Sequence, residues 1–342
     1  MSPERRALFS YYGDDFTGST DALEVLASNG VSSVLFPDPP EERHLARFAE
    51  CRAIGIAGES RSRGPAWMPE HLPAVFEALK RYGAPYCQYK VCSTFDSSPE
   101  FGSVGRAIEI GREVFGVPYV PVVVAAPHLK RYVLFGNLFA AGGGAVHRID
   151  RHPTMRHHPV TPMNEADLRL HLARQTAGKT LLLDILALQG QHPEDRLDAI
   201  LEEHPQAILF DGLDEASLQT TGRLLWERRP AASSFAVGSS GLTQALILHW
   251  RAAGLLPPAP RPCAPAPAER LIVVSGSCSP VTEGQIRWAA GHGFAAMRMD
   301  AAGMETSLRE GVAALGEGRS IVVYTALGPE DCGGTPGGEE LG

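Results

Sequence analysis

Short apolar runs alternate with helical patterns along most of this 342-residue chain. The runs predict strands at residues 53–57, 86–91, 120–125, 180–184, 207–211 and 235–237. Helical spacing of apolar residues fills many of the intervals, at residues 69–82, 104–115, 165–175 and 215–226. Strands that are apolar almost throughout and alternate with helices are typical of a mainly parallel sheet covered on both faces. The expected fold class is therefore α/β.

Proline is concentrated at residues 255–269, and this stretch divides the chain. Proline at such density excludes helix and central strand and favours an extended, semi-rigid linker. We therefore expect a first domain over residues 1–254, a linker over 255–269 and a second domain over 270–342. Each domain is expected to hold a mainly parallel sheet flanked by helices.

The second expected domain is small. Its predicted strands lie at residues 271–274, 295–299 and 321–324, with two helices among them. A core of this size is marginal, so the segment either packs on the first domain or on a partner, or it is an incomplete domain. Unpaired strand edges associate readily, and we expect a homo-oligomer, most simply a dimer.

The charge balance excludes some classes of partner. A formal net charge of −8 argues against nucleic acid or an anionic membrane as the main partner. No apolar run approaches the roughly 18 residues of a membrane span. The first residues lack the apolar segment of a secretion signal, which favours the cytoplasm.

Two adjacent carboxylates, Asp14 and Asp15, stand where the first expected strand ends and a helix begins. Ligands of open α/β sheets usually bind at such places. As an alternative, the stretch is only a helix start, with Ser19 or Thr20 as the cap and Asp21 complementing the helix dipole. That alternative leaves the paired carboxylates unexplained, because like charges repel unless a cation, donor or substrate uses them. We therefore favour a ligand site.

A second turn, residues 58–64, follows the expected strand at 53–57 and carries Arg61. A guanidinium suits a carboxylate or phosphate because it donates two parallel hydrogen bonds. The alternative for this single loop is a surface segment with solvated arginines.

A third turn begins with Lys90, near the end of another apolar strand. The polar side chains that follow within six residues include Ser93, Thr94 and Asp96. Together they offer donors to a polyhydroxylated anion. The alternative is a capping loop in which Ser97 or Ser98 starts the next helix, which leaves the lysine in an apolar strand unexplained.

Two further turns lie between an expected strand and a helix. Ser275, Gly276 and Ser277 precede the first helix of the second domain, where backbone N–H groups can cradle phosphate. Residues 238–241 form either a fifth ligand-facing turn or only a helix start. The glycines at 142–144 are interpreted as a flexible loop, and no metal-ligating set is assigned.

Four motifs occur in a fixed order: GDDFTG (13–18), KVCSTFDSS (90–98), HPVTPM (158–163) and VSGSCS (274–279). Together they resemble the four-carbon acid sugar kinase family. The resemblance implies a sugar-acid-binding N-terminal domain and an ATP-binding C-terminal domain. It also implies phosphorylation of a terminal hydroxyl of oxo-tetronates, threonate or erythronate, or of the branched five-carbon 3-oxo-isoapionate. Tyr11-Tyr12 and the run at 152–155 are most similar to the oxo-isoapionate branch.

We hypothesise the following roles for the residues of these turns in such a kinase. Asp15, with Asp14 as the substitute, is the expected general base. Arg61 and Lys90 are expected to hold the substrate carboxylate. The remaining expected substrate-binding residues are Thr17, Gly18, Ser93, Thr94 and Asp96. Ser275, Gly276 and Ser277 are expected to bind the phosphates of ATP, with Mg²⁺ shielding their charge.

The chain departs from the family at residues 333–342, which do not match the glycine-rich nucleotide loop expected near the C-terminus. We therefore expect an incomplete ATP site. The alternative function is a sugar-acid binding protein with impaired catalysis.

Overall fold

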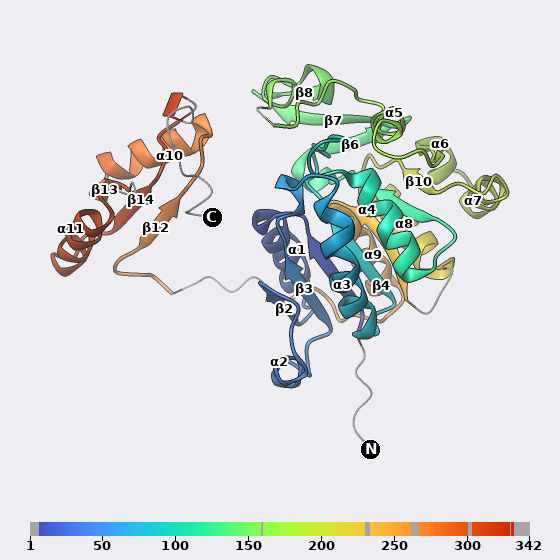
Figure 1. The fold of residues 1–342 in the computed structure, drawn as a ribbon, viewed down its shortest axis with the longest axis horizontal. Helices are drawn as coiled ribbons and strands as arrows, with labels where there is room; N and C mark the ends of the chain where they lie inside the picture. Colours follow the sequence, from blue (N-terminus) through green and yellow to red (C-terminus); the bar gives the residue numbers. More distant parts are fainter. Residues whose placement is uncertain are drawn as a thin grey trace. The chain divides into compact units, whose positions relative to one another are not determined.

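The computed structural model describes residues 7–158, 160–229, 233–260, 266–299, 303–328 and 330–331. The chain divides into two compact units, Met1–Pro262 and Cys263–Gly342 (Figure 1). Residues 261–265 of the expected linker and the divergent segment 333–342 lie outside the described residues.

The first unit is built on an eight-stranded parallel sheet with the order β2-β3-β1-β4-β11-β5-β10-β9. Its strands are β1 (Phe9–Gly13), β2 (Ser33–Phe36), β3 (Ala53–Ala57), β4 (Tyr86–Lys90), β5 (Val120–Val123), β9 (Thr180–Leu183), β10 (Ala207–Phe210) and β11 (Ser234–Gly238). The strands β1, β3, β4 and β11 are buried along their whole length. The predicted α/β class with a mainly parallel sheet is confirmed.

Helices cover both faces of this sheet (Figure 1). They are α1 (Phe16–Ser28), α2 (Glu42–Arg47), α3 (Trp67–Arg81), α4 (Val104–Phe115), α5 (Leu168–Ala173), α6 (Ile185–Leu188), α7 (Pro193–Leu201), α8 (Glu215–Glu227) and α9 (Ser240–Ala252). Adjacent residues of a strand point to opposite faces. Accordingly, the ring of Tyr12 packs on Phe76 of α3, whereas the hydroxyl of Tyr11 donates to the carbonyl of Ser19 on α1.

A small antiparallel sheet follows β5 and was not expected from the sequence. It consists of β6 (Arg131–Leu134), β7 (Asn137–Gly142) and β8 (Ala145–Arg148). The expected flexible loop at 142–144 is instead a tight hairpin turn, in which Gly143 and Gly144 have φ of 59° and 86°. Positive φ at both central residues is the geometry that joins two antiparallel strands most tightly.

Asp211, directly after β10, fastens this small sheet to the large one. Its buried carboxylate accepts the backbone N–H groups of Phe135 and Gly136 in the β6–β7 turn, and of Ile185. Burial raises the pKa of Asp211 to about 6, against the lowering effect of these three donors. This carboxylate therefore stabilises the fold by joining the β6–β7 turn to the large sheet.

The second unit holds a three-stranded parallel sheet with the order β12-β14-β13. Its elements are β12 (Ile272–Ser275), α10 (Pro280–Gly291), β13 (Ala295–Arg298), α11 (Met304–Gly316) and β14 (Ile321–Tyr324). One buried cluster of this unit comprises Met297, Ala314 and Ile321, and its other described buried apolar residues are Ile286, Val322 and Ala326. In neither unit does a described helix have the length and apolar character needed to cross a bilayer.

Candidate functional site

The ends of three neighbouring strands bring the predicted turns together. In the sheet register, Gly13 at the end of β1 lies beside Ala57 at the end of β3 and beside Lys90 at the end of β4. Each strand is followed by one of the polar turns expected from the sequence. Because the strands are parallel, all three turns start at the same edge of the sheet.

Arg61 joins the two adjacent carboxylates. It lies in the short 3₁₀ helix η1 (Ser60–Ser62) after β3. Its Nε and Nη2 donate to the two oxygens of Asp14 at 3.0 and 2.7 Å, and Nη1 donates to Asp15 Oδ2 at 2.7 Å. The paired carboxylates therefore have the cationic partner that their proximity requires.

The helix α1 begins earlier than it would if Ser19 or Thr20 were its N-cap. Asp15, rather than Ser19 or Thr20, is its N-cap, and Asp15 Oδ1 accepts the N–H of Gly18 at 2.6 Å. The helix therefore starts at Phe16, which places Asp21 beyond the first turn. Its first turn includes the exposed Thr17.

The two carboxylates differ in access to solvent. The side chain of Asp14 is 3% exposed, whereas those of Asp15 and Arg61 are 29% and 22% exposed. Asp14 therefore lies beneath the site, and Asp15 and Arg61 form its accessible surface.

Burial dominates the electrostatics of Asp14. It raises the pKa of Asp14 to about 6, helped by the negative charge of Asp15 and opposed by Arg61 and Lys90. Burial alone would lower the pKa of Arg61, but Asp14, Cys92 and Asp96 outweigh it and the pKa lies above its usual value. The guanidinium is thus charged at every physiological pH.

Lys90 lies beneath the same edge and is almost fully buried. Its ammonium forms an ion pair with Asp21 Oδ2 at 2.9 Å and donates to the carbonyl of Val91 at 3.1 Å. A Cβ atom on Gly18 would lie 2.5 Å from Asp15 Oδ1, 3.3 Å from Lys90 Nζ and 3.7 Å from Arg61 Nη2. The Asp15 carboxylate and both cations therefore converge on Gly18, where there is no room for a side chain.

The turn after β4 presents a hydroxyl and a carboxylate in contact. The hydroxyl of Thr94 donates to Asp96 Oδ1, and Asp96 Oδ2 lies 3.5 Å from the hydroxyl of Thr161. Ser93 is partly exposed in this turn. Phe95, between Thr94 and Asp96, has φ of 56°. This backbone conformation is strained for a bulky side chain, and such strain recurs at functional sites.

Thr161 was missed as a site residue. Its hydroxyl contact with Asp96 brings it to the turn after β4, and its N–H donates to His158 Nδ1 at 3.0 Å. The HPVTPM motif was the available sequence signal for Thr161. Because the motif does not follow a predicted strand, its place in the fold could not be predicted. Asp21 was missed because its partner lies 69 residues away, on another strand.

The turns before α4 and α9 contain serines that cap helices or make buried contacts and are not assigned to ligand binding. Ser103, rather than Ser97 or Ser98, caps α4, and Ser97 instead contacts His171 Nε2 at 2.9 Å. At the end of β11, Ser239 caps α9 and donates to the carbonyl of Val124. The turn at 238–241 is therefore a buried helix start.

In the second unit, the predicted phosphate turn follows β12. Ser279 caps α10, and the hydroxyl of Thr282 donates to Ser277 Oγ at 3.0 Å. Ser275 and Ser277 are partly exposed and Gly276 is exposed. Within the turn, the N–H groups of Ser277 and Ser279 donate to the hydroxyls of Ser275 and Ser277. Hydroxyls before the N-terminus of a twelve-residue helix can hold phosphate.

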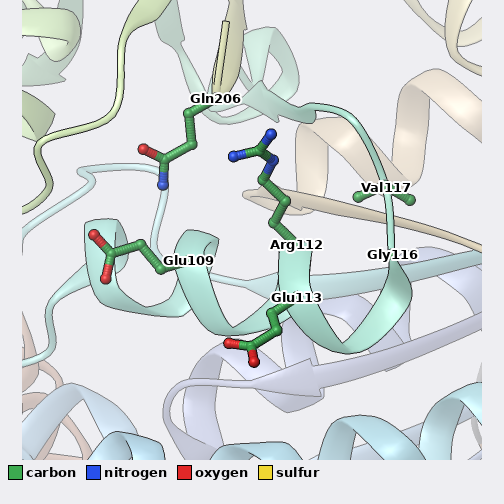
Figure 2. A pocket seen from close by; sticks show the side chains of 6 residues that line it. All are labelled: Glu109, Arg112, Glu113, Gly116, Val117 and Gln206. Atoms are coloured by element: carbon green, nitrogen blue, oxygen red, sulfur yellow. The ribbon is translucent and has the colours of Figure 1, made fainter.

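A pocket of about 460 Å³ lies away from these turns, at the C-terminal end of α4 (Figure 2). Its lining includes Gln206, directly before β10, so it belongs to the opposite edge of the sheet. Its carboxylate Glu109 accepts hydrogen bonds from Arg106 and Thr176. We therefore assign no substrate site there. Among the described residues, no group of three or more metal-ligating side chains is placed to hold an ion.

The family of the chain follows from its sequence. The sequence model of the sugar-binding N-terminal domain matches residues 9–246, which contain all the first-unit turns described above. Together with the relatives below, this match shows that the chain belongs to the four-carbon acid sugar kinase family.

Two relatives illustrate the range of the family. A 3-oxo-isoapionate kinase of Paraburkholderia graminis is 52% identical over 334 residues, which cover 95% of this chain and 71% of that protein. A 3-oxo-tetronate kinase of Cupriavidus necator is 28% identical, over 95% of this chain and 74% of the relative.

Solved structures share the fold. A Salmonella typhimurium protein matches with a TM-score of 0.75 and 24% identity, covering 94% of this chain and 75% of that one. A Bordetella bronchiseptica protein, crystallised with citrate as a domain-swapped dimer, matches with a TM-score of 0.56 and 20% identity, covering 92% and 73%.

Proposed function

We propose that the protein transfers a phosphoryl group from ATP to a terminal hydroxyl of a small oxo sugar acid, with 3-oxo-isoapionate as the substrate. The observation that carries the proposal is the Arg61 guanidinium between two carboxylates at the carboxyl edge of the sheet. The choice of substrate rests on the 52% identity to a 3-oxo-isoapionate kinase.

Asp15 is the proposed general base. Its carboxylate is fixed by the N–H of Gly18 and by Arg61 and is reachable from solvent. A carboxylate fixed in this way can accept the proton of an attacking hydroxyl without an elevated pKa. Asp14 is buried, so we propose that it orients Arg61. It is the second candidate for the general base, after Asp15.

Arg61 and Lys90 are proposed to bind the substrate carboxylate. The partly exposed Arg61 has N–H donors left over from its three bonds to the aspartates, and Lys90 adds positive charge from below. The substrate hydroxyls are assigned to a set of small polar residues around this pair: Thr17, Gly18, Ser93, Thr94 and Asp96. Thr161 supports this set through Asp96.

Ser275, Gly276 and Ser277 are proposed to bind ATP phosphates through their hydroxyl and backbone N–H groups. Mg²⁺ bound to the nucleotide supplies charge neutralisation in such transfers. The turn fits a phosphate because it combines partly exposed hydroxyls with the N-terminus of α10.

We propose that the protein works as a homodimer in the cytoplasm. The domain-swapped dimer of the Bordetella bronchiseptica protein supports the first part. The second part follows from the proposed substrate ATP, which cytoplasmic metabolism supplies.

ADP release in the presence of ATP and Mg²⁺ tests the proposal. The protein is expected to release ADP with 3-oxo-isoapionate, and more slowly with 3-oxo-tetronate. Thermal stabilisation by the sugar acid without ADP release would favour the alternative, a sugar-acid binding protein. Absence of both thermal stabilisation and ADP release would contradict the proposal.

A further inference from the structure

We infer that Asp21 is a positioning residue that holds Lys90 toward the substrate carboxylate, an inference that rests on the function proposed above. The Lys90 ammonium has three N–H donors. One contacts Asp21 Oδ2 at 2.9 Å and one donates to the Val91 carbonyl at 3.1 Å. The third donor is left for a ligand.

The face of α1 toward Lys90 carries the anchor Asp21 and the small residue Gly18. Gly18 and Asp21 are three residues apart, so they lie on the same side of the helix. The position of a Gly18 Cβ is 2.5 Å from Asp15 Oδ1, 3.3 Å from Lys90 Nζ and 3.7 Å from Arg61 Nη2. The two cations therefore converge beside the Asp15 carboxylate, and a substrate carboxylate that binds next to this point would meet both of them.

A carboxylate is needed beside Lys90 for two physical reasons. An ammonium buried without a counter-charge destabilises the folded state strongly. The four-carbon stem of lysine is also flexible, so a fixed partner is required to hold the charge in one direction. Asp21 provides both because it projects from a packed helix and is itself one-third exposed.

The chain offers a matched control on the same helix. Glu24 lies three residues beyond Asp21, and both carboxylates act on the charge of His128 in η2 (Pro127–Leu129). The ion pair with Lys90, however, is made by Asp21. Removing the charge of Glu24 therefore changes the local field without releasing Lys90.

Titration calorimetry on the whole chain tests the inference with two ligands: 3-oxo-isoapionate and an analogue whose carboxylate is replaced by a primary alcohol. Asp21→Asn is expected to weaken binding of the acid about tenfold, or ~1.4 kcal/mol, and to leave binding of the alcohol unchanged. Glu24→Gln is expected to change neither. A merely structural role of Asp21 would weaken both ligands equally and would overturn the inference.

The double variant Asp21→Asn/Lys90→Met removes the risk that a buried unpaired lysine unfolds the single variant. It is expected to bind the acid as weakly as Lys90→Met alone, because Asp21 acts through Lys90. Additive losses would overturn the inference. Absence of acid binding by the wild type would contradict the proposed function as well, whereas wild-type binding with unaltered Asp21→Asn affinity would contradict the inference alone.

Discussion

Asp14 and Asp15 are neighbours in the sequence, but the end of β1 gives them different surroundings. Asp14 turns beneath the edge of the sheet and binds Arg61 with both oxygens, whereas Asp15 caps α1 and stays reachable. One arginine bonded to both fixes their geometry. The division of tasks therefore comes from burial, because the two side chains are chemically identical.

The first prediction at this scale concerns Asp15→Asn. Loss of ADP release is expected, because an amide cannot accept the hydroxyl proton. Binding of the sugar acid, measured by calorimetry, should weaken by less than about tenfold, or ~1.4 kcal/mol. Turnover within a few-fold of the wild type would remove Asp15 from the role of base.

A second prediction uses the pKa of Asp14, which burial raises to about 6. Below that pH the carboxyl becomes neutral and loses its two charged hydrogen bonds to Arg61. Affinity for the sugar acid should therefore fall as the pH drops from about 7 to about 5, through the range set by this pKa.

Asp211 supplies the control, because burial raises its pKa to about 6 as well, in a structural setting. Asp14→Asn should give weak binding that is flat over this pH range. Asp211→Asn should keep the slope. The opposite pattern would assign the pH dependence to the β6–β7 turn instead of the site.

At the scale of elements, the site depends on helices packed tightly on the sheet and on one another. In α8, a Cβ atom on Gly222 would lie 1.9 Å from the carbonyl oxygen of Ala245 in α9. The helices α8 and α9 pack on the same face of the sheet as α1. Close backbone contact between helices thus explains a glycine in a helix interior.

Gly222→Ala is therefore expected to lower the free energy of unfolding by about 1–3 kcal/mol, the usual cost of overpacking. Urea denaturation of the first unit measures this. Gln219→Ala, on the exposed side of the same helix, should change stability by less than about 0.5 kcal/mol. Equal effects would mean that α8 and α9 can separate without cost.

The sequence predicted the regular elements better than the irregular ones. Apolar strands such as β3 and amphipathic helices such as α4 carry a local signal, and both were placed within a residue of their observed ends. The antiparallel sheet β6–β8 was missed, because its half-exposed strands lack a continuous apolar run.

The same limit applies to the candidate site. Parallel neighbouring strands explain why turns predicted separately lie together. Which group pairs with which could not be predicted, because Arg61–Asp14 and Lys90–Asp21 depend on side-chain directions across different elements. The specific roles of these residues stay predictions.

At the scale of the molecule, the second unit differs from the first in how it buries apolar surface. Its edge strand β12 is strongly exposed, with Ile272 at 64% and Val274 at 78%. A neutral apolar edge strand with open backbone groups tends to pair with another chain. This property is consistent with the proposed dimer.

We predict that the chain self-associates through β12, as measured by sedimentation velocity. Val274→Lys should shift the protein toward the monomer, because an edge lysine opposes strand pairing. Val281→Lys, at a similarly exposed position on α10, should not. Equal dissociation by both variants would indicate association through the surface in general rather than through β12.

The proposed function depends on binding of an oxo sugar acid by Arg61 at the carboxyl edge of the first sheet. Calorimetric titration of 3-oxo-isoapionate into wild type and Arg61→Ala, each repeated with the uncharged alcohol analogue, tests it most directly. We expect saturable binding of the acid by the wild type and a loss of at least about tenfold in Arg61→Ala, or ~1.4 kcal/mol, with the analogue little affected. Equal losses for acid and analogue, or undiminished acid binding by Arg61→Ala, would contradict it.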